Sequence, residues 1–306
     1  MAQQSPPLRH LFRNRCRSIA ISVQKHYIYD MKARTFLTAA ALALCCTFAA
    51  SAQTDSTFFI DGSMGRLSTR LQLPELQEGE KCPVVVICHG FMGNKNEPLL
   101  SAIAENLVEL GIGAIRCDFN GHGQSEGEFV DMTVLNEIDD ALAVIDYVRR
   151  MPQTDGISIL GHSQGGVVAA MTAGQLGGSV LKSAVLMAPA AVLRDDALRG
   201  STMGATYDPW HAPEYVDIFG HRLGRDYIQT ALSLPIYETA AKYDGPVLVL
   251  HGMADKVVPY TYGERFGREM PDCTVQLLPG DDHGFTADMT GAAEMAADWL
   301  ASTLLK

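Results

Sequence analysis

The 306-residue sequence predicts an α/β fold, with a mostly parallel sheet flanked by helices on both faces. Two observations lead to this prediction. Short apolar and β-branched runs alternate along the chain with stretches whose apolar residues recur at helical spacing. One of these runs, residues 156–160, leads into Gly161-His162-Ser163-Gln164-Gly165 and then into a helical stretch from residue 167. Strand, sharp turn with Ser at the apex and helix form the context of a nucleophile elbow.

The pentapeptide at residues 161–165 has the glycines that this turn requires. Its apical Ser is held in a strained backbone conformation, and the residues two before and two after it approach closely. Gly161 and Gly165 remove the Cβ atoms that would collide there. Ser163 is therefore the candidate nucleophile. A glycine-rich turn with a solvated Ser has the same pattern, so this interpretation depends on partners elsewhere in the chain.

The elements before the elbow begin with an antiparallel pair. Residues 56–60 and 66–73 predict a hairpin, with Leu at alternate positions of the second strand. Residues 84–88 are continuously apolar, as in a strand that is covered on both faces. Residues 97–110 carry apolar side chains at helical spacing and predict a helix. Residues 114–118 predict the next strand.

The same alternation continues to the end of the chain. Thr133 caps a helix whose apolar residues recur as far as Val148, and Pro152 follows its end. The strand and helix of the elbow come next. Three further strands and a closing amphipathic helix are predicted, at residues 183–187, 246–250, 274–278 and 290–304. Strands that alternate with helices in this way favour parallel pairing.

The alternation is interrupted between residues 190 and 235. This stretch contains many Asp, Tyr, Gly and Pro residues, and its apolar residues show no clear period. A long irregular segment in a compact domain is usually functional. We therefore expect a small lid, inserted over the carboxyl ends of the strands, within a single domain that spans residues 53–306.

The first 52 residues predict a leader that is not part of the fold. Met31 looks like the true start. It is followed by positive charges in residues 32–34, by an apolar stretch over residues 35–50 and by Ala50-Ser51-Ala52. This is the layout of a secretory signal peptide. We expect cleavage between Ala52 and Gln53, with export to the periplasm or the extracellular space.

Two features of the leader leave alternatives open. Cys45 could be the lipid-bearing residue of a lipoprotein, but Leu44 precedes it where a small residue is expected. Residues 1–30 carry five basic side chains. They represent either upstream sequence or a long basic region in front of the apolar stretch.

The charge balance argues against nucleic-acid partners. Residues 1–52 hold seven of the 24 Lys and Arg residues and one of the 35 Asp and Glu residues. The remaining chain has 17 basic and 34 acidic residues, and its formal net charge is −17. Such a protein is not expected to bind nucleic acid or an anionic membrane. The apolar stretch of residues 35–50 is too short to favour a membrane span.

Four cysteines remain after residue 52, and their spacing matches no zinc site. Cys88 and Cys117 fall in predicted strands, where we expect buried free thiols. A single disulfide is the alternative for an exported protein.

Two later segments carry the partners that a nucleophilic Ser needs, a base and an acid that orients it. Asp255 follows the strand at residues 246–250, and His283 follows the strand at residues 274–278. Both lie just past the carboxyl end of a strand, as Ser163 does, so the three loops can converge at one edge of the sheet. Asp281 and Asp282 compete with Asp255 as the acid, but they are too close to His283 in sequence to face its ring easily.

A tetrahedral intermediate also needs backbone N–H donors for its oxyanion. The residue after the nucleophile, Gln164, supplies one donor. The loop after the strand at residues 84–88 begins His89-Gly90-Phe91, and we expect the N–H of Phe91 to be the second donor. An ordinary tight turn between strand and helix is the alternative interpretation of this loop.

These motifs together resemble the α/β-hydrolase superfamily. The resemblance rests on the elbow, on the oxyanion loop, on residues 118–125 (Asp-Phe-Asn-Gly-His-Gly-Gln-Ser), and on Asp255 and His283. Four further stretches are similar to bacterial cinnamoyl (feruloyl) esterases, namely residues 132–137, 161–169, 188–191 and 234–238. The resemblance runs from about Phe59 to the C-terminus.

The resemblance implies hydrolysis of ferulate, caffeate or p-coumarate esters from plant material, either small molecules or oligosaccharide-linked. It assigns Ser163 as nucleophile, His283 as base and then acid, and Asp255 as the orienting acid. Asp196 and Tyr227 match the lid residues that meet the phenolic hydroxyl of the substrate. One departure is Met203, which stands where relatives are expected to have Gln. No metal or cofactor is implied.

Several alternatives remain open at the level of the sequence. They are a serine peptidase of the prolyl-oligopeptidase type, a general short-chain acyl esterase, and a non-catalytic binding protein on a hydrolase scaffold. The intact Ser, His and Asp argue against the last of these. The sequence leaves monomer and homodimer open.

Overall fold

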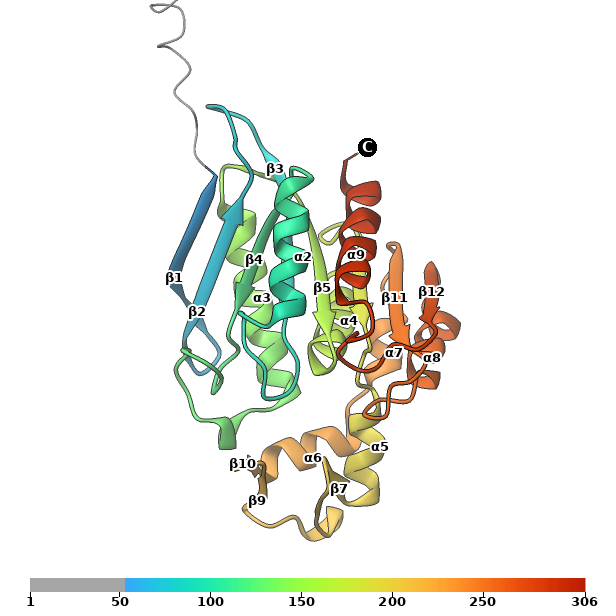
Figure 1. Ribbon diagram of the computed structural model, residues 1–306. Coiled ribbons are helices and arrows are strands. Elements are labelled where there is room, and N and C mark those ends of the chain that lie inside the picture. Colours follow the sequence, from blue (N-terminus) through green and yellow to red (C-terminus); the bar gives the residue numbers. More distant parts are fainter. Residues whose placement is uncertain (1–52, 306) are drawn as a thin grey trace, which may run out of the picture. The chain divides into compact units, whose positions relative to one another are not determined.

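The computed structural model describes residues 53–305 of the chain (Figure 1). The predictions on the leader concern Met31 as the start, the signal peptide and cleavage after Ala52, and they lie outside the described residues.

Eight strands form one sheet in the order β1-β2-β4-β3-β5-β6-β11-β12. The strands β1 and β2 pair antiparallel with each other, and β2 pairs antiparallel with β4, while all other neighbours are parallel. This confirms the predicted mostly parallel sheet with an antiparallel start. The bounds are β1 (Thr54–Gly62), β2 (Gly65–Leu73), β3 (Cys82–Cys88), β4 (Gly113–Cys117), β5 (Thr154–His162), β6 (Ala184–Met187), β11 (Val247–Gly252) and β12 (Cys273–Leu278).

Helices cover both faces of this sheet. The bounds are α2 (Pro98–Glu109), α3 (Val134–Arg150), α4 (Gln164–Leu176), α5 (Val192–Arg199), α6 (Arg225–Ser233), α7 (Ile236–Ala240), α8 (Thr261–Glu269) and α9 (Met289–Leu304). The helices α2 and α9 pack together on one face, and α3, α4, α7 and α8 lie on the other (Figure 1).

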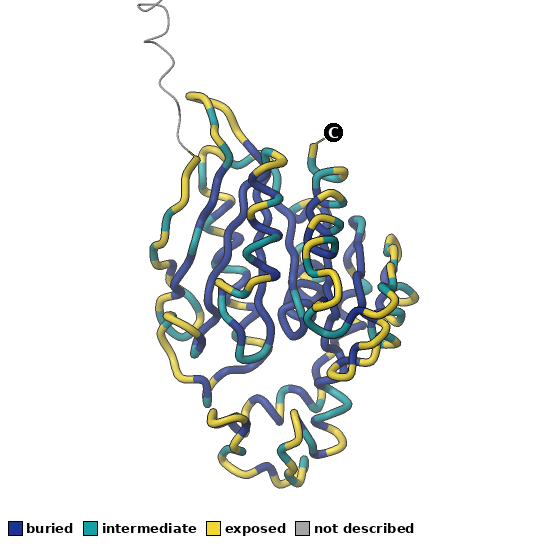
Figure 2. The backbone as a smooth tube through the Cα atoms, in the orientation of Figure 1, coloured by how far each residue is buried: buried dark blue, intermediate teal, exposed yellow. Residues whose placement is uncertain are grey.

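The central strand β3 shows why its sequence is continuously apolar. Val84 and Val86 pack into the core on the α3 and α4 face, whereas Val85 and Ile87 pack into the core under α2 and α9. Alternate side chains of a strand point to opposite faces, so a strand covered on both faces has no polar position. The central strands are accordingly buried along their length (Figure 2).

The N-terminus of α3 has the cap that the sequence predicts. The Thr133 side chain accepts from the backbone N–H of Asn136, and the Asn136 side chain accepts from the backbone N–H of Thr133. This reciprocal capping box satisfies two N–H groups at the start of the helix.

The segment between β6 and α7, residues 190–235, is called the insertion below. It holds α5, α6, the 3-10 helix η3 (Pro209–His211) and two small hairpins, β7 (Ser201–Thr202) with β8 (Ala205–Thr206) and β9 (Tyr215–Ile218) with β10 (His221–Gly224). It lies beyond the carboxyl ends of β3 and β5 (Figure 1). Although the sequence showed no clear period there, α5 and α6 are regular helices. Each is so short that only three of its residues are buried.

The insertion contacts the core through α3 and through the 3-10 helix η2 (Phe129–Asp131). The rings of Phe129 and His221 lie 5.1 Å apart between their centroids at this contact. No helix within residues 53–305 is long and apolar enough to cross a membrane. Among these residues, Cys82, Cys88, Cys117 and Cys273 are free thiols, and the first three are buried.

Candidate active site

Ser163 lies at the sharp turn between β5 and α4. Its φ of 57° and ψ of −122° are strained for a residue with a side chain. A Cβ atom on Gly161 would collide with the carbonyl group of Gly165, and one on Gly165 would collide with the carbonyl oxygens of Cys88 and His89. The backbone passes so closely here that only glycine fits at both positions, which is the geometry that the pentapeptide predicts.

The structure brings together the three residues that the sequence selected. The Oγ atom of Ser163 lies 2.8 Å from Nε2 of His283, and Nδ1 of His283 lies 2.7 Å from Oδ2 of Asp255. They follow β5, β12 and β11 at the same edge of the sheet. Since a carboxylate only accepts, His283 donates from Nδ1, which leaves the lone pair on Nε2 free to receive the Ser163 proton.

Asp255 is held as an anion by four donors. Its Oδ1 accepts from the backbone N–H groups of Val257 and Val258, both at 2.8 Å. Its Oδ2 accepts from His283 and, at 3.2 Å, from Nε2 of His251. Burial of this carboxyl opposes ionisation, but the hydrogen bonds from His251 and His283 outweigh it and hold the pKa of Asp255 well below its usual range.

The two residues predicted to supply the oxyanion donors lie close to the nucleophile, since Gln164 follows Ser163 in the chain and Phe91 follows Gly90, which approaches Ser163. Within the described part of the chain, neither the N–H of Phe91 nor that of Gln164 donates to a protein acceptor. Both residues line the same cavity as Ser163. Gly90 allows this close approach, because a Cβ atom there would lie 2.9 Å from the Cβ of Ser163. Two free N–H groups beside a Ser hydroxyl are the arrangement that stabilises an oxyanion.

The oxyanion loop is braced at both ends by buried polar groups. Nε2 of His89 lies 2.9 Å from the N–H of Phe119 and must accept, so its Nδ1–H donates to the carbonyl of Gly90 at 2.8 Å. Burial lowers the pKa of His89 to about 3, so the ring stays neutral. At the other end, Nζ of Lys95 pairs with Oδ2 of Asp118 at 2.7 Å. Asp118 lies in the motif of residues 118–125, but no local sequence pattern predicts either brace.

His162, inside the elbow, supports the loop that carries His283. Its Nε2–H donates to the carbonyl oxygen of His283 at 2.8 Å, and the two rings lie 5.1 Å apart between centroids. Burial, with repulsion from His283, lowers the pKa of His162 to about 4. A neutral donor at this position fixes the backbone of the base without adding a positive charge beside it.

A cavity opens beside Ser163 between the core and the insertion. Its apolar walls are formed by Phe91, Ala190, Val192, Leu193, Val257 and Val258. Polar groups from the insertion also line it, namely Asp196, Thr202 and Tyr227. Met203, which replaces an expected Gln, lines it as well. The cavity therefore offers an apolar slot with polar groups along one part of its wall.

The two residues expected to meet the substrate both reach this cavity but differ in their surroundings. Asp196 lies on α5, is partly exposed and is paired with Arg199. Tyr227 lies on α6, is only 2% exposed and donates from its hydroxyl to Oε1 of Gln164 at 2.8 Å. Tyr227 is thus part of the support of the elbow as well as a wall of the cavity.

Glu137 on α3 is a buried neighbour of the site and is not among the predicted site residues. Its Oε2 accepts from Nε2 of Gln164 at 2.8 Å. The side chain is 1% exposed, and burial raises its pKa to about 8. A sequence signal existed, because Glu137 precedes the buried Ile138 and lies four positions before the buried Ala141, on the inward face of α3.

The fold and the converging Ser, His and Asp define a hydrolase. A family model described as "Serine aminopeptidase, S33" matches residues 79–215. Est1E from Butyrivibrio proteoclasticus with ferulic acid bound is 30% identical and has a TM-score of 0.77, over 81% of this chain and 100% of Est1E. The chain belongs to the α/β-hydrolase superfamily.

A second group of relatives has a name that refers to a different acyl group, palmitoyl. The mitochondrial palmitoyl-protein thioesterase ABHD10 of Mus musculus is 27% identical over 224 residues, which are 70% of this chain and 74% of that protein. The structure of mouse α/β-hydrolase domain-containing protein 10 shares the fold at a TM-score of 0.62 and 22% identity, over 81% of this chain and 99% of that one.

Proposed function

We propose that this protein is a serine carboxylic ester hydrolase that releases hydroxycinnamic acids from plant-derived esters. We base this on one observation, the apolar cavity that begins at Ser163 and carries Asp196 and Tyr227 on its wall. A cinnamoyl group is a flat apolar body with a polar ring substituent, and this cavity matches both parts. The relation to Est1E, whose structure holds ferulic acid, supports the same acyl group.

In the proposed reaction, Oγ of Ser163 attacks the ester carbonyl while Nε2 of His283 takes the hydroxyl proton. The N–H groups of Phe91 and Gln164 stabilise the oxyanion. His283 then gives its proton to the departing alcohol, and an acyl enzyme forms on Ser163. Water, deprotonated by His283, attacks the acyl carbonyl, releases the acid and restores the Ser163 hydroxyl.

In our proposal the insertion acts as a lid that binds the aromatic ring. Tyr227 already donates its proton to Gln164, so its oxygen presents a lone pair that can accept from a phenolic hydroxyl. Asp196 keeps a second carboxylate oxygen beyond its contact with Arg199, and this oxygen can accept as well. Two acceptors on the lid favour a ring that carries free hydroxyl groups.

The test of this function compares kcat/KM for methyl ferulate, a butyrate ester, a palmitoyl thioester and a peptide amide. We expect methyl ferulate to be the best substrate, by about tenfold or more over the butyrate ester, because the ring adds contacts that a short chain lacks. A preference for the palmitoyl thioester would favour the activity of the ABHD10 relatives instead. A preference for the amide would favour a peptidase.

The lid residues are tested with Tyr227→Phe and Asp196→Asn. Each variant leaves a polar group of the bound complex unpaired, at a cost of about 1–3 kcal/mol in the transition state for ferulate. The butyrate ester should lose less. Tyr215→Phe and Asp226→Asn are matched controls, because both residues lie in the insertion without lining the cavity. Equal losses on both substrates would mean that these residues serve folding or the elbow.

We also propose that the protein is exported and begins near Gln53 after processing. The basic and apolar segments ahead of Ala52 support this. N-terminal sequencing of protein recovered from the cell envelope or the medium tests it. Lipid on Cys45, or a mature chain that still begins at Met31, would contradict the proposal.

A further inference from the structure

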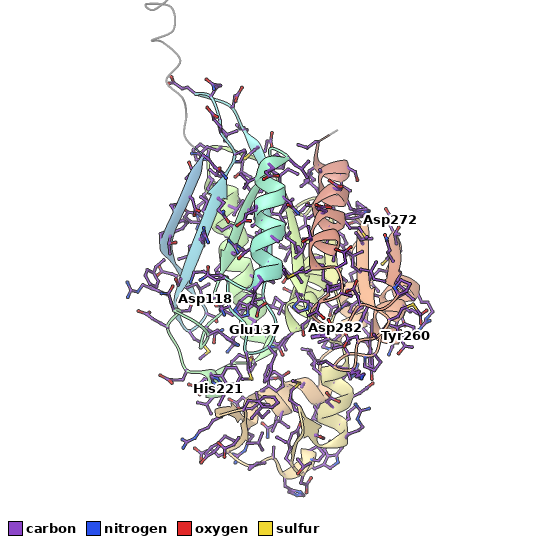
Figure 3. The ribbon with its side chains drawn as sticks, viewed as in Figure 1. Asp118, Glu137, His221, Tyr260, Asp272 and Asp282 are labelled. Carbon is purple, nitrogen blue, oxygen red and sulfur yellow. The ribbon has the colours of Figure 1, made fainter. Side chains whose placement is uncertain are left out.

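A hydrogen-bonded chain of three buried side chains connects α3, the elbow and the insertion. Tyr227 donates to Oε1 of Gln164 at 2.8 Å, and Nε2 of Gln164 donates to Oε2 of Glu137 at 2.8 Å. Glu137 is 1% exposed, and Gln164 and Tyr227 are each 2% exposed. Figure 3 labels Glu137 at the lower end of the sheet, on the side of the insertion. This hydrogen-bonded chain therefore begins at an internal carboxyl, that of Glu137, and ends at the wall of the proposed acyl cavity.

This hydrogen-bonded chain can run in either of two directions, because the middle residue is an amide. Turning the Gln164 amide by half a turn exchanges its oxygen and nitrogen at nearly the same positions. Gln164 would then accept from Glu137 and donate to the Tyr227 oxygen. The Tyr227 proton, released from Gln164, would be free to point into the cavity.

We propose that Glu137 sets the direction of this chain and so decides whether the Tyr227 hydroxyl accepts from the substrate ring or donates to it. Glu137 is in this sense a positioning residue that determines specificity. The inference rests on the proposed function, because it concerns the ring substituent that Tyr227 meets.

The charge of Glu137 selects the direction for a simple reason. An ionised Glu137 can only accept, so Gln164 must turn its NH₂ group toward it, and Tyr227 must donate to Gln164. A protonated Glu137 in that same arrangement would have an unpaired proton, because its Oε1 is buried and has no partner among residues 53–305. Turning the amide removes this defect, since the Glu137 O–H can then donate to the Gln164 oxygen.

Both charge states of Glu137 are accessible near neutral pH. Burial raises its pKa to about 8, the hydrogen bond from Gln164 opposes this rise, and repulsion by Asp140 on the same helix adds to it. From the other elements, Cys88 at the end of β3 and Tyr227 on α6 face this carboxyl. Burial raises the pKa of both of these groups, so Cys88 and Tyr227 stay neutral while Glu137 changes charge.

The test measures selectivity between methyl 4-hydroxycinnamate and methyl 4-methoxycinnamate as a function of pH. A methoxy group only accepts, whereas a phenol also donates. Relative to Glu137→Gln, which cannot ionise, the wild-type ratio of kcat/KM for the hydroxy over the methoxy ester should rise about fivefold from about pH 6 to about pH 9, as Tyr227 becomes an acceptor. The comparison with Glu137→Gln is needed because the phenol of the hydroxy ester itself ionises in this range, which changes the ratio in both enzymes equally.

Matched variants separate the effect of Glu137 ionisation from other effects of pH. Asp139→Asn removes a carboxyl from the exposed face of the same helix and should keep the wild-type pH dependence. Tyr227→Phe, with Glu137 intact, should lose it. Division by the Glu137→Gln ratio cancels the ionisation of the phenolic substrate, and the ratio of the two esters cancels any general change in turnover.

Each outcome of this experiment either supports or overturns the role proposed for Glu137. The same pH dependence of the ratio in the wild type and in Glu137→Gln would overturn the role of Glu137 while the esterase function stands. Failure of the wild type to hydrolyse either cinnamate, while it hydrolyses a butyrate ester, would overturn the proposed function and this inference with it.

Discussion

Replacement of Asp255 by Asn should disable the base while the fold is retained. Two backbone N–H donors, from Val257 and Val258, face Oδ1 of Asp255. They require an acceptor, so the new amide must place its oxygen there and its NH₂ group at the position of Oδ2. That NH₂ group then faces Nδ1 of His283, which has to accept instead of donate. The His283 proton moves to Nε2, where it points at Ser163 and blocks proton transfer.

The size of the effect follows from the loss of the correct tautomer. The same change in the triad of a serine protease lowers kcat about 10⁴-fold. This corresponds to about 5.4 kcal/mol, at about 1.36 kcal/mol for each factor of ten. The expected loss here is of the same order, because His283 has no other acceptor for Nδ1–H among residues 53–305.

The assay is kcat for methyl ferulate together with the melting temperature. Asp281→Asn is the matched control, because Asp281 is also buried in a neighbouring loop, and its carboxylate accepts from the backbone of Ala287 and Asp288. It should keep most of the activity. Asp255→Asn retaining a tenth of wild-type kcat, or Asp281→Asn losing as much as Asp255→Asn, would refute the assignment of the orienting acid.

Three further changes have defined outcomes. Ser163→Ala should lower kcat by about 10⁶ and leave the melting temperature nearly unchanged, and retention of a tenth of the activity would remove Ser163 from the reaction. Gly90→Ala should lower kcat by about 10²–10³, because its Cβ meets Ser163 and displaces an oxyanion donor; a fully active variant would contradict this. Burial raises the pKa of Glu137 to about 8 in the folded protein, whereas an unperturbed Glu has a pKa of about 4.3. The free energy of unfolding therefore decreases as the pH rises from about 4.3 toward 8, because the unfolded chain releases this proton more easily. Glu137→Gln should therefore gain in melting temperature relative to the wild type across this window, and a difference independent of pH would speak against the raised pKa.

The sheet and the positions of Ser163, Asp255 and His283 could be predicted from the sequence because local patterns encode them. The runs at residues 84–88 and 246–250 are apolar throughout, as strands covered on both faces must be. Parallel strands end at one edge of the sheet, so residues that follow such strands meet without any knowledge of side-chain packing. Glycines mark the elbow itself.

The supports of the site could not be predicted in this way. The hydrogen bond between His89 and Phe119 joins residues that are 30 positions apart in the sequence, and the one between Gln164 and Tyr227 joins residues that are 63 positions apart. Such pairs depend on how the helices and the sheet pack against each other, and no periodic pattern in the sequence predicts them. The helices of the insertion leave no clear pattern in the sequence for a related reason. Its helix α5 has eight residues, too few for a helical period to stand out.

The most direct measurement is a single turnover of methyl ferulate by the wild-type enzyme, quenched in acid on the millisecond scale and followed by peptide mass spectrometry. We expect a transient feruloyl adduct on the peptide that contains Ser163, absent from Ser163→Ala, which disappears as ferulate is released. Ferulate released without any adduct on Ser163, or an adduct on another residue, would contradict the acyl-enzyme mechanism and the assignment of the nucleophile.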